Sequence, residues 1–287
     1  MTITSLVPRS IRRLPLLRRL YFNLFTMRYV RALLFPRPSY AQAGEDTRIR
    51  ELLKDVRFFI DIGSYDGITD SNTFLFALRG AHGICFEPVR ETFIKLSALY
   101  RFNRRVECRC CGISDIKRQG TIYPMQGLSC IPETEDPDHS VCHPVLAQRT
   151  RCEPIQLVTF ADAVAGLDLP DPIDLLSLDV EGHELNVLRS IPFEQFRFRM
   201  IVVETHLRQP LTSGFLWRHR DLDAINALLR TCGYYPVSES WANTLYAPRS
   251  EPADVAREET GAANHAQEHP FAEPRMTVLD PHNDCCV

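Results

Sequence analysis

The sequence lacks three features that would point to a function at once: a long hydrophobic run, a strong net charge and paired cysteine motifs. No stretch reaches the roughly 20 uninterrupted apolar residues that cross a membrane. Arginines interrupt every apolar stretch near the N-terminus, so we expect neither a secretory signal nor a membrane span, and a cytoplasmic protein. With 33 basic and 36 acidic residues the net charge is only −3, so we expect no nucleic-acid partner.

The ten cysteines are not spaced like zinc ligands. Cys108, Cys110 and Cys111 cluster, but no pair of tightly spaced cysteines follows them at the distance that zinc sites show. We therefore expect small, mostly buried side chains in a reducing compartment.

The composition is that of a globular protein with two unlike ends. Apolar residues make up 45% of the chain and charged residues 24%, which is ordinary for one large α/β domain. Residues 1–38 contain eight arginines and no acidic residue, whereas residues 248–287 contain eight acidic residues and three arginines. The acidic tail has few large apolar residues, which predicts disorder. We assign residues 39–247 to the folded domain.

The basic N-terminal segment has the pattern of an amphipathic helix. Residues 11–34 alternate Arg with Leu, Phe, Tyr and Val at helical spacing, and Pro36 ends the run. One interpretation is a helix that lies on an anionic membrane surface and gives a peripheral membrane contact. The other, which we favour, is a helix that packs on the domain and exposes its arginine face.

The central part alternates apolar strands with helical segments. The predicted strands cover 56–62, 83–86, 106–111, 173–178 and 200–203, with two short ones near 234–237 and 244–247. The predicted helices cover 71–78, 92–100, 185–191 and 222–229. Continuous apolar strands separated by helices indicate a parallel sheet covered on both faces, and the last two strands can close it as an antiparallel hairpin. Residues 117–158 do not follow this alternation of strands and helices. We expect them to form an inserted hairpin and loop near the ligand site.

The first candidate site is the glycine turn after the first strand, which runs from Asp61 to Gly67. Ligands of open parallel sheets bind beyond the carboxyl ends of the strands. A dinucleotide motif GxGxxG would need glycine where Tyr65 stands, and Asp61 suits a cationic group better than a phosphate. Glu87 ends the second strand, where its carboxylate can accept both hydroxyls of a ribose. These features favour S-adenosylmethionine (SAM) over NAD.

The second candidate site gathers acids and imidazoles at the ends of the next two strands. Because parallel strands end at the same edge of a sheet, these side chains should lie together, which we interpret as functional. The residues are Asp179, Glu181, His183, Glu204 and His206. Glu184, at the start of the following helix, is expected to be a capping residue.

The ordered series of these motifs resembles the FkbM family of SAM-dependent methyltransferases. The matching segments are Ser39–Asp46, Phe59–Gly67, Phe86–Pro88, Gly112–Asp115, Asp174–Ile191 and Ile201–His206. The resemblance implies a Rossmann-like α/β fold with a mostly parallel seven-stranded sheet and helices on both faces. It also implies SAM as cofactor and, as typical acceptors, hydroxyl groups of sugars, glycolipids, polysaccharides or polyketide-like natural products.

By position, the resemblance assigns the glycine turn to the methionine part of SAM. Asp61, Gly63, Ser64 and Gly67 would line that part, and Glu87 would hold the ribose.

The remaining cofactor contacts implied by the resemblance come from three places in the chain. Ser114 and Asp115, after the third strand, would lie near the adenine. Gln42 and Glu45 would belong to a segment that covers the cofactor, and Asp179 would lie beside the sulfonium.

Methyl transfer to a hydroxyl needs a base or a metal ion, because an alcohol is a poor nucleophile until its proton leaves. Our candidates for the base are His206 and Asp179, followed by His183, since histidine titrates near neutral pH. Alternatively, Asp179, Glu181 and Glu204 hold Mg²⁺, which prefers oxygen ligands.

Two other functions compete with methyl transfer. A nucleotide-dependent oxidoreductase is disfavoured by Tyr65 in place of glycine. A methyltransferase-like protein that binds a membrane or a partner without catalysis is disfavoured because the acids at 61, 87 and 179 are all present.

Overall fold

The computed structural model describes residues 15–123, 152–208, 216–218 and 221–249. Side chains are described from residue 23 onward, except at 206–208 and 216–218. The predictions for the first 14 residues, for most of the insertion and for the acidic tail from residue 250 lie outside these residues. The chain divides into one unit of Met1–Arg249 and a second of Ser250–Val287, and all described residues belong to the first.

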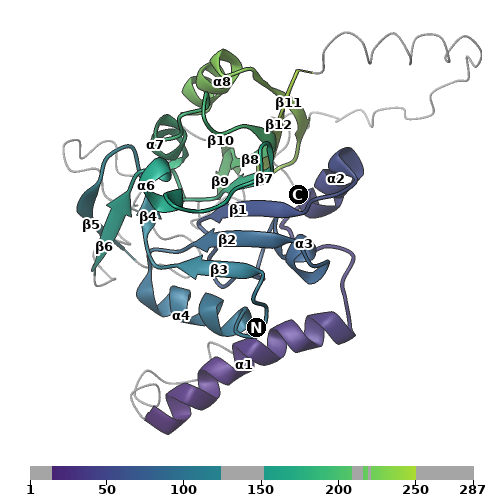
Figure 1. Ribbon diagram of the computed structural model, residues 1–287, viewed down its shortest axis with the longest axis vertical. Coiled ribbons are helices and arrows are strands. Elements are labelled where there is room, and N and C mark those ends of the chain that lie inside the picture. Colours follow the sequence, from purple (N-terminus) through teal and green to yellow (C-terminus); the bar gives the residue numbers. More distant parts are fainter. Residues whose placement is uncertain (1–14, 124–151, 209–215, 219–220, 250–287) are drawn as a thin grey trace, which may run out of the picture. The chain divides into compact units, whose positions relative to one another are not determined.

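Seven strands form the central sheet (Figure 1). They are β1 (Phe58–Ile62), β2 (His82–Phe86), β3 (Val106–Arg109), β7 (Ile173–Leu178), β8 (Phe198–Glu204), β11 (Tyr234–Glu239) and β12 (Asn243–Pro248). Their order across the sheet is β3-β2-β1-β7-β8-β12-β11, which is 3-2-1-4-5-7-6 when they are counted along the chain. The first five pair in parallel, and β12 pairs antiparallel with β8 and β11. The predicted mostly parallel, Rossmann-like sheet and its closing hairpin are confirmed.

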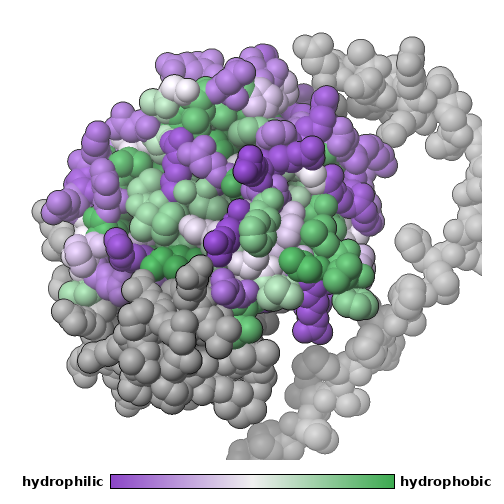
Figure 2. All heavy atoms as spheres, turned by 60° about the horizontal axis from the view of Figure 1, so that its bottom comes forward, coloured by the Kyte–Doolittle hydropathy of each residue, from purple (hydrophilic) through white to green (hydrophobic). Residues whose placement is uncertain are grey.

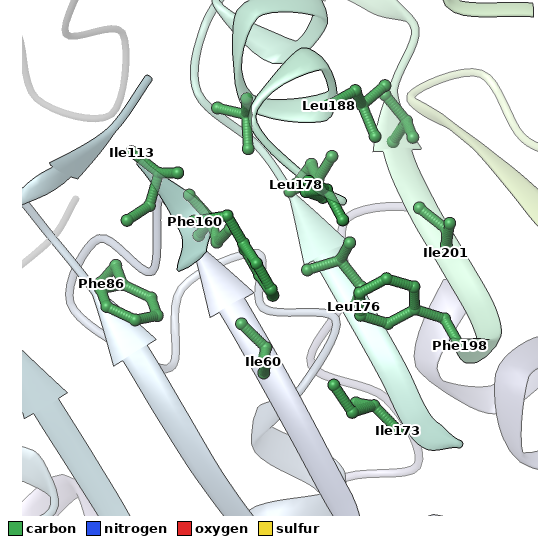
Figure 3. Packing of buried hydrophobic residues seen from close by; sticks show 14 of the residues in the cluster. Ile60, Phe86, Ile113, Phe160, Ile173, Leu176, Leu178, Leu188, Phe198 and Ile201 are labelled. Atoms are coloured by element: carbon green, nitrogen blue, oxygen red, sulfur yellow. The ribbon is translucent and has the colours of Figure 1, made fainter. Parts of the chain in front are cut away.

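Helices cover both faces of this sheet (Figure 1). They are α2 (Glu45–Leu53), α3 (Phe74–Leu78), α4 (Arg90–Leu99), α6 (Phe160–Val164), α7 (Glu184–Arg189) and α8 (Leu222–Thr231). Successive side chains of a strand point to opposite faces, so Phe59 and Ile60 of β1 enter different apolar clusters. Ile60 packs in the cluster that contains Phe160 of α6 and Leu188 of α7 (Figure 3), and Phe59 in the one that contains Phe74 of α3. Burial on both faces explains why the strands are continuously apolar.

Element boundaries differ from the predicted ones by up to three residues, and two of these differences bear on the site. The helix expected from Ser71 begins at Phe74, because the Ser71 hydroxyl accepts a hydrogen bond from the Phe74 N–H (3.1 Å) and forms a turn before the helix. The strand expected over 106–111 ends at Arg109, and the next strand, β4 (Gly112–Ile113), lies in a separate sheet.

That second sheet contains the two ends of the predicted insertion. β6 (Glu153–Val158) lies between β4 and β5 (Arg118–Ile122), and it pairs parallel with β4 and antiparallel with β5. After β8, the short strands β9 (His206–Arg208) and β10 (Leu216–Arg218) form an antiparallel pair of their own.

The N-terminal helix α1 (Pro15–Leu34) packs on α4. The hydroxyl of Thr26 donates a 2.6 Å hydrogen bond to the carbonyl of Ala98, and Phe25 and Ala32 are buried. Packing of this helix on the domain, the interpretation favoured from the sequence, is therefore observed. Within the described ranges, none of the helices combines the length and the apolar character that crossing a bilayer requires.

The outer side of α1 differs from the prediction, which gave it an arginine face. Arg31 is exposed there, but so are several large apolar side chains, and Figure 2 shows green and purple residues interspersed on this side of the molecule. The exposed apolar residues are Leu24, Met27, Leu33, Leu34 and, just after the helix, Phe35.

Candidate functional site

The glycine turn after β1 is held at the edge of the sheet by backbone hydrogen bonds. The N–H groups of Gly63 and Ser64 both donate to the carbonyl of Phe86 at the end of β2 (3.0 and 3.1 Å), and the Gly67 N–H donates to the Ser64 carbonyl (2.9 Å). Gly63 has a φ of 89°, and a Cβ atom at this position would overlap the carbonyl oxygen of Asp179. Only glycine fits here, so Gly63 brings the turn directly against the end of β7.

Asp61 lies beneath this turn and is only 5% exposed. Its Oδ2 accepts a 2.5 Å hydrogen bond from the hydroxyl of Thr73, and its backbone carbonyl accepts one from the hydroxyl of Ser64 (2.9 Å). Burial raises the pKa of Asp61 to about 6, and the hydrogen bond from Thr73 opposes that rise. A cationic ligand beside this carboxyl group would favour its charged form.

Glu87 follows β2 and reaches back to the same turn. Its Oε2 accepts a hydrogen bond from the backbone N–H of Tyr65 (3.1 Å) and its Oε1 accepts one from that of Val89 (2.8 Å). Burial raises the pKa of Glu87 to about 8, the two amide bonds oppose this, and the charge of Asp61 adds to it. Each carboxylate oxygen has a second lone pair, so Glu87 can accept ribose hydroxyls and keep both amide bonds.

Asp179, Glu181 and Glu204 come together at the ends of β7 and β8, as the sequence predicted. One carboxylate oxygen from each residue lies within 4.8 Å of the other two. Burial raises the pKa of all three groups, that of Asp179 to about 7, and neighbouring acids raise them further. Asp61 is among the acids that act on Asp179, so the glycine turn and this acid group share one electrostatic environment.

The turn that follows these acids is capped by Glu184. Its carboxylate oxygens accept hydrogen bonds from the backbone N–H groups of Val180 (2.8 Å) and Gly182 (3.0 Å), which confirms the expected capping role. His183 follows this turn, directly before α7. Its ring is 5% exposed, and its Nε2 lies 3.0 Å from the hydroxyl oxygen of Ser114.

The residues assigned to the adenine follow β4 in the small sheet, because the chain leaves the central sheet after β3. Ser114 is fully buried, and its hydroxyl donates to the carboxylate of Asp115 (3.0 Å), which is exposed.

The segment expected to cover the cofactor is attached to the far end of the sheet. Glu45 is buried, its Oε2 accepts a bond from the Ala43 N–H (2.8 Å), and its Oε1 accepts bonds from Ser240 (2.6 Å) and Asn243 (2.9 Å). Gln42 is half-buried on the loop before it. Glu45 therefore fixes the start of α2 to the start of β12, so it anchors the segment.

His206 begins β9, and β8 ends at Glu204. This corrects the prediction that His206 ends the fifth strand. Its side chain lies outside the described residues, so its role in proton transfer stays a prediction.

Three contacts at the site were not predicted from the sequence. They are Thr73 with Asp61, Arg28 with Asp66, and Asn243 with Glu45. The polar residues before α3 were a local signal for the contact between Thr73 and Asp61. The other two join residues 38 and 198 positions apart, and no local pattern points to them.

The acidic side chains at this edge of the sheet fit a positively charged nucleoside. Asp61 near the end of β1 and Glu87 after β2 are buried acids on adjacent parallel strands, and the backbone of Asp179 lies against Gly63 of the turn. A pyrophosphate would face carboxylates here, whereas an ammonium group, a sulfonium and a ribose diol would each find a matching partner. The residues present therefore suit SAM.

Comparison with solved structures gives distant similarities. Monomeric WbdD is 12% identical, with a TM-score of 0.36, over 80% of this chain and 41% of that one. The METTL16 methyltransferase domain is 12% identical, with a TM-score of 0.40, over 72% and 67% of the two chains. TnmH is 14% identical, with a TM-score of 0.34, over 86% and 63%. The chain thus spans less than half of WbdD, and no curated protein matches it significantly.

A family model provides the assignment. The model described as the methyltransferase FkbM domain matches residues 61–236, which is more than half of the chain. The matched span includes the glycine turn, Glu87 and the acid group at the ends of β7 and β8. The chain therefore belongs to the FkbM family of SAM-dependent methyltransferases.

Proposed function

We propose that the protein transfers the methyl group of SAM to a hydroxyl oxygen of a sugar, a glycolipid or polysaccharide, or a polyketide-like natural product. SAM supplies an electrophilic methyl group on a sulfonium. Asp61 and the turn residues Gly63, Ser64 and Gly67 would bind its methionine part, and Glu87 its ribose. Positioning of the acceptor oxygen against the methyl group then supplies much of the rate enhancement.

The observation that carries the acceptor class is the group of three close carboxylates, Asp179, Glu181 and Glu204. Carboxylates accept hydrogen bonds and repel anions, so this group favours an acceptor that presents hydroxyl donors over one that presents a phosphate or a carboxylate. Asp61 adds negative charge to the same region. A neutral polyol such as a sugar matches this surface.

Proton removal from the acceptor remains assigned to the sequence candidates His206 and Asp179. The contact of His183 with Ser114 makes it the weakest of the three candidates. If His206 is the base, His206→Ala should lower turnover by roughly 10²–10⁴-fold and leave SAM affinity unchanged, because the group acts only as the proton leaves. Normal turnover in this variant would assign removal of the acceptor proton to the acid group.

The acceptor class is tested with labelled SAM and a panel of glycans, lipid-linked sugars, polyketides, amines and phosphorylated sugars. Mass analysis identifies the product and the atom that gains the methyl group. We expect methylation of a hydroxyl on a neutral acceptor, and none with Glu87→Ala, which should weaken SAM binding by about 1.5–3 kcal/mol. Methylation of an amine or a phosphorylated substrate would contradict the proposed acceptor class.

We also propose that α1 contacts an anionic membrane surface, which would bring lipid-linked acceptors to the enzyme. The support is the combination on one segment of exposed Leu24, Met27 and Phe35 with the eight arginines of residues 1–38. Binding to vesicles with anionic lipid should decline as salt rises, and Met27→Gln with Phe35→Ser should weaken it several-fold. Equal binding to neutral vesicles, or no effect of the double substitution, would exclude this contact.

A further inference from the structure

The two strands that carry the acid group bring its carboxylates together from different parts of the chain. β7 and β8 are parallel neighbours with Leu178 opposite Val203, so Asp179 and Glu204 each follow the same level of the sheet. Glu181 returns to this position because it adopts a left-handed φ of 57° in the turn after β7. This conformation is uncommon for a residue other than glycine, and it places the carboxylate of Glu181 beside the other two.

No cation on the described side chains offsets these three acids. The ion pairs formed by described residues involve other carboxylates, and the two charges found to act on Glu181 are those of Asp179 and Glu184, both negative. Glu184 cannot serve as a neutralising partner, since it is an acid and its oxygens already accept the amides of the turn. Among the described residues, no basic side chain therefore pairs with this acid group.

A second observation concerns hydrogen bonding. Glu204 is 8% exposed and is hydrogen-bonded to Asp179 within the acid group, and its buried Oε2 accepts no hydrogen bond from an N–H or hydroxyl donor of the described residues. Buried carboxylate oxygens are ordinarily bonded to a donor or to a metal ion. A buried carboxylate oxygen that no N–H or hydroxyl group satisfies, within a group of three carboxylates, fits a metal ligand whose ion is not bound.

The spacing of the three oxygens also suits an ion. Oxygen ligands lie about 2.1 Å from Mg²⁺ and about 2.4 Å from Ca²⁺, so two oxygens on opposite sides of such an ion are roughly 4–5 Å apart. The 4.8 Å limit that encloses the acid group is compatible with one shared ion. All-oxygen ligand sets select Mg²⁺, Mn²⁺ or Ca²⁺ over softer metals.

We propose that Asp179, Glu181 and Glu204 form a binding site for one divalent cation of the hard, oxygen-preferring class. Three protein ligands leave about three positions of a six-coordinate ion for oxygens of water or substrate. If the proposed methylation of hydroxyls holds, two neighbouring acceptor hydroxyls fit those positions, and the ion would lower the pKa of the one that reacts. The role of the ion in activating the acceptor hydroxyl rests on the proposed function, whereas cation binding does not.

The test uses the full-length protein, freed of metal and without SAM, titrated calorimetrically with MgCl₂, MnCl₂ and CaCl₂. Hard cations are the appropriate probes because ten cysteines and nine histidines in the chain offer sites for softer ions. We expect one site per chain, and at least tenfold weaker binding in Glu204→Gln and in Glu181→Gln. Glu51→Gln, which changes an exposed acid paired with Arg48, should bind like the parent.

Thermal unfolding separates lost binding from lost structure. Without metal, Glu204→Gln should unfold at the same temperature as the parent or higher, because glutamine keeps the size of the side chain and cannot become charged in this crowded acid group. Adding Mg²⁺ should then stabilise the parent and not the variant. No binding up to millimolar cation, or equal binding in the parent and Glu204→Gln, would overturn the site. A separate titration with SAM measures cofactor binding. Failure of the proposed methyl transfer can therefore be distinguished from absence of the cation site.

Discussion

The guanidinium of Arg28 on α1 lies 2.6 Å from the carboxylate of Asp66, near the end of the glycine turn. Asp66 also accepts hydrogen bonds from the backbone N–H groups of Ile68 (3.1 Å) and Thr69 (2.8 Å), and Arg28 donates a second bond to the Thr69 hydroxyl (3.1 Å). Asp66 is buried, so this ion pair is stronger than an exposed one. The basic N-terminal helix therefore holds the turn assigned to the cofactor.

Arg28→Ala should lower the free energy of unfolding by about 1 kcal/mol, because Asp66 keeps its amide partners and loses only the ion pair. SAM affinity should fall as well, since the turn is less firmly held. Arg31→Ala is the matched control, because that arginine is exposed on the same helix. Chemical denaturation and a double-mutant cycle with Asp66→Asn measure the coupling, and a coupling near zero would show that the helix does not stabilise the turn.

Gly63→Ala should destabilise the protein by about 3 kcal/mol or more and abolish SAM binding. The added Cβ overlaps the carbonyl of Asp179, so β1 and β7 would have to move apart, in addition to the cost of a positive φ. Gly166→Ala isolates the second cost: Gly166 has a φ of 77° and nothing within 4 Å of an added Cβ. Denaturant titrations of both variants should therefore give unequal losses, and equal losses would contradict the steric argument.

Thr73→Val should raise the pKa of Asp61 further above its value of about 6, because the variant lacks the hydroxyl that donates to the carboxylate. More of the Asp61 carboxyl is then neutral near pH 6.5, so the loss of SAM affinity, about tenfold there, should shrink at pH 8. Calorimetric titration at the two pH values measures this. Thr73→Ser keeps the hydroxyl and should restore affinity, and failure to restore it would assign the effect to packing.

Glu87→Gln should flatten the pH dependence of stability. Burial raises the pKa of Glu87 from an ordinary 4.5 to about 8, so the folded state binds this proton more tightly than the unfolded state does. The stability that this group contributes is full below about pH 4.5 and is lost as the pH rises to about 8. The melting temperature of the variant, followed from pH 6 to 8.5, should fall less than that of the parent. Parallel curves would show that the Glu87 pKa is not raised.

Features that depend on local order along the chain were predictable from the residues alone. Continuous apolar strands predicted a sheet buried on both faces. Asp61, Glu87 and Asp179 could be placed at one edge because all parallel strands end there, whatever the details of packing. The close contact between Gly63 and Asp179 follows the same logic, since β1 and β7 are neighbours. The cap formed by Glu184 was predictable because its partners lie within four residues.

The pairing of polar groups across the fold could not be predicted, because it depends on long-range packing. Ser114 and His183 lie 69 positions apart, and no local pattern predicted their contact. Glu45 was assigned to the cofactor, but its bonds to Ser240 and Asn243 tie together segments about 195 residues apart. The pKa values also depend on burial and on neighbouring charges, which exist only after the strands have assembled. The local sequence pattern therefore determines at which strand end a side chain lies, whereas long-range packing determines which groups that side chain contacts.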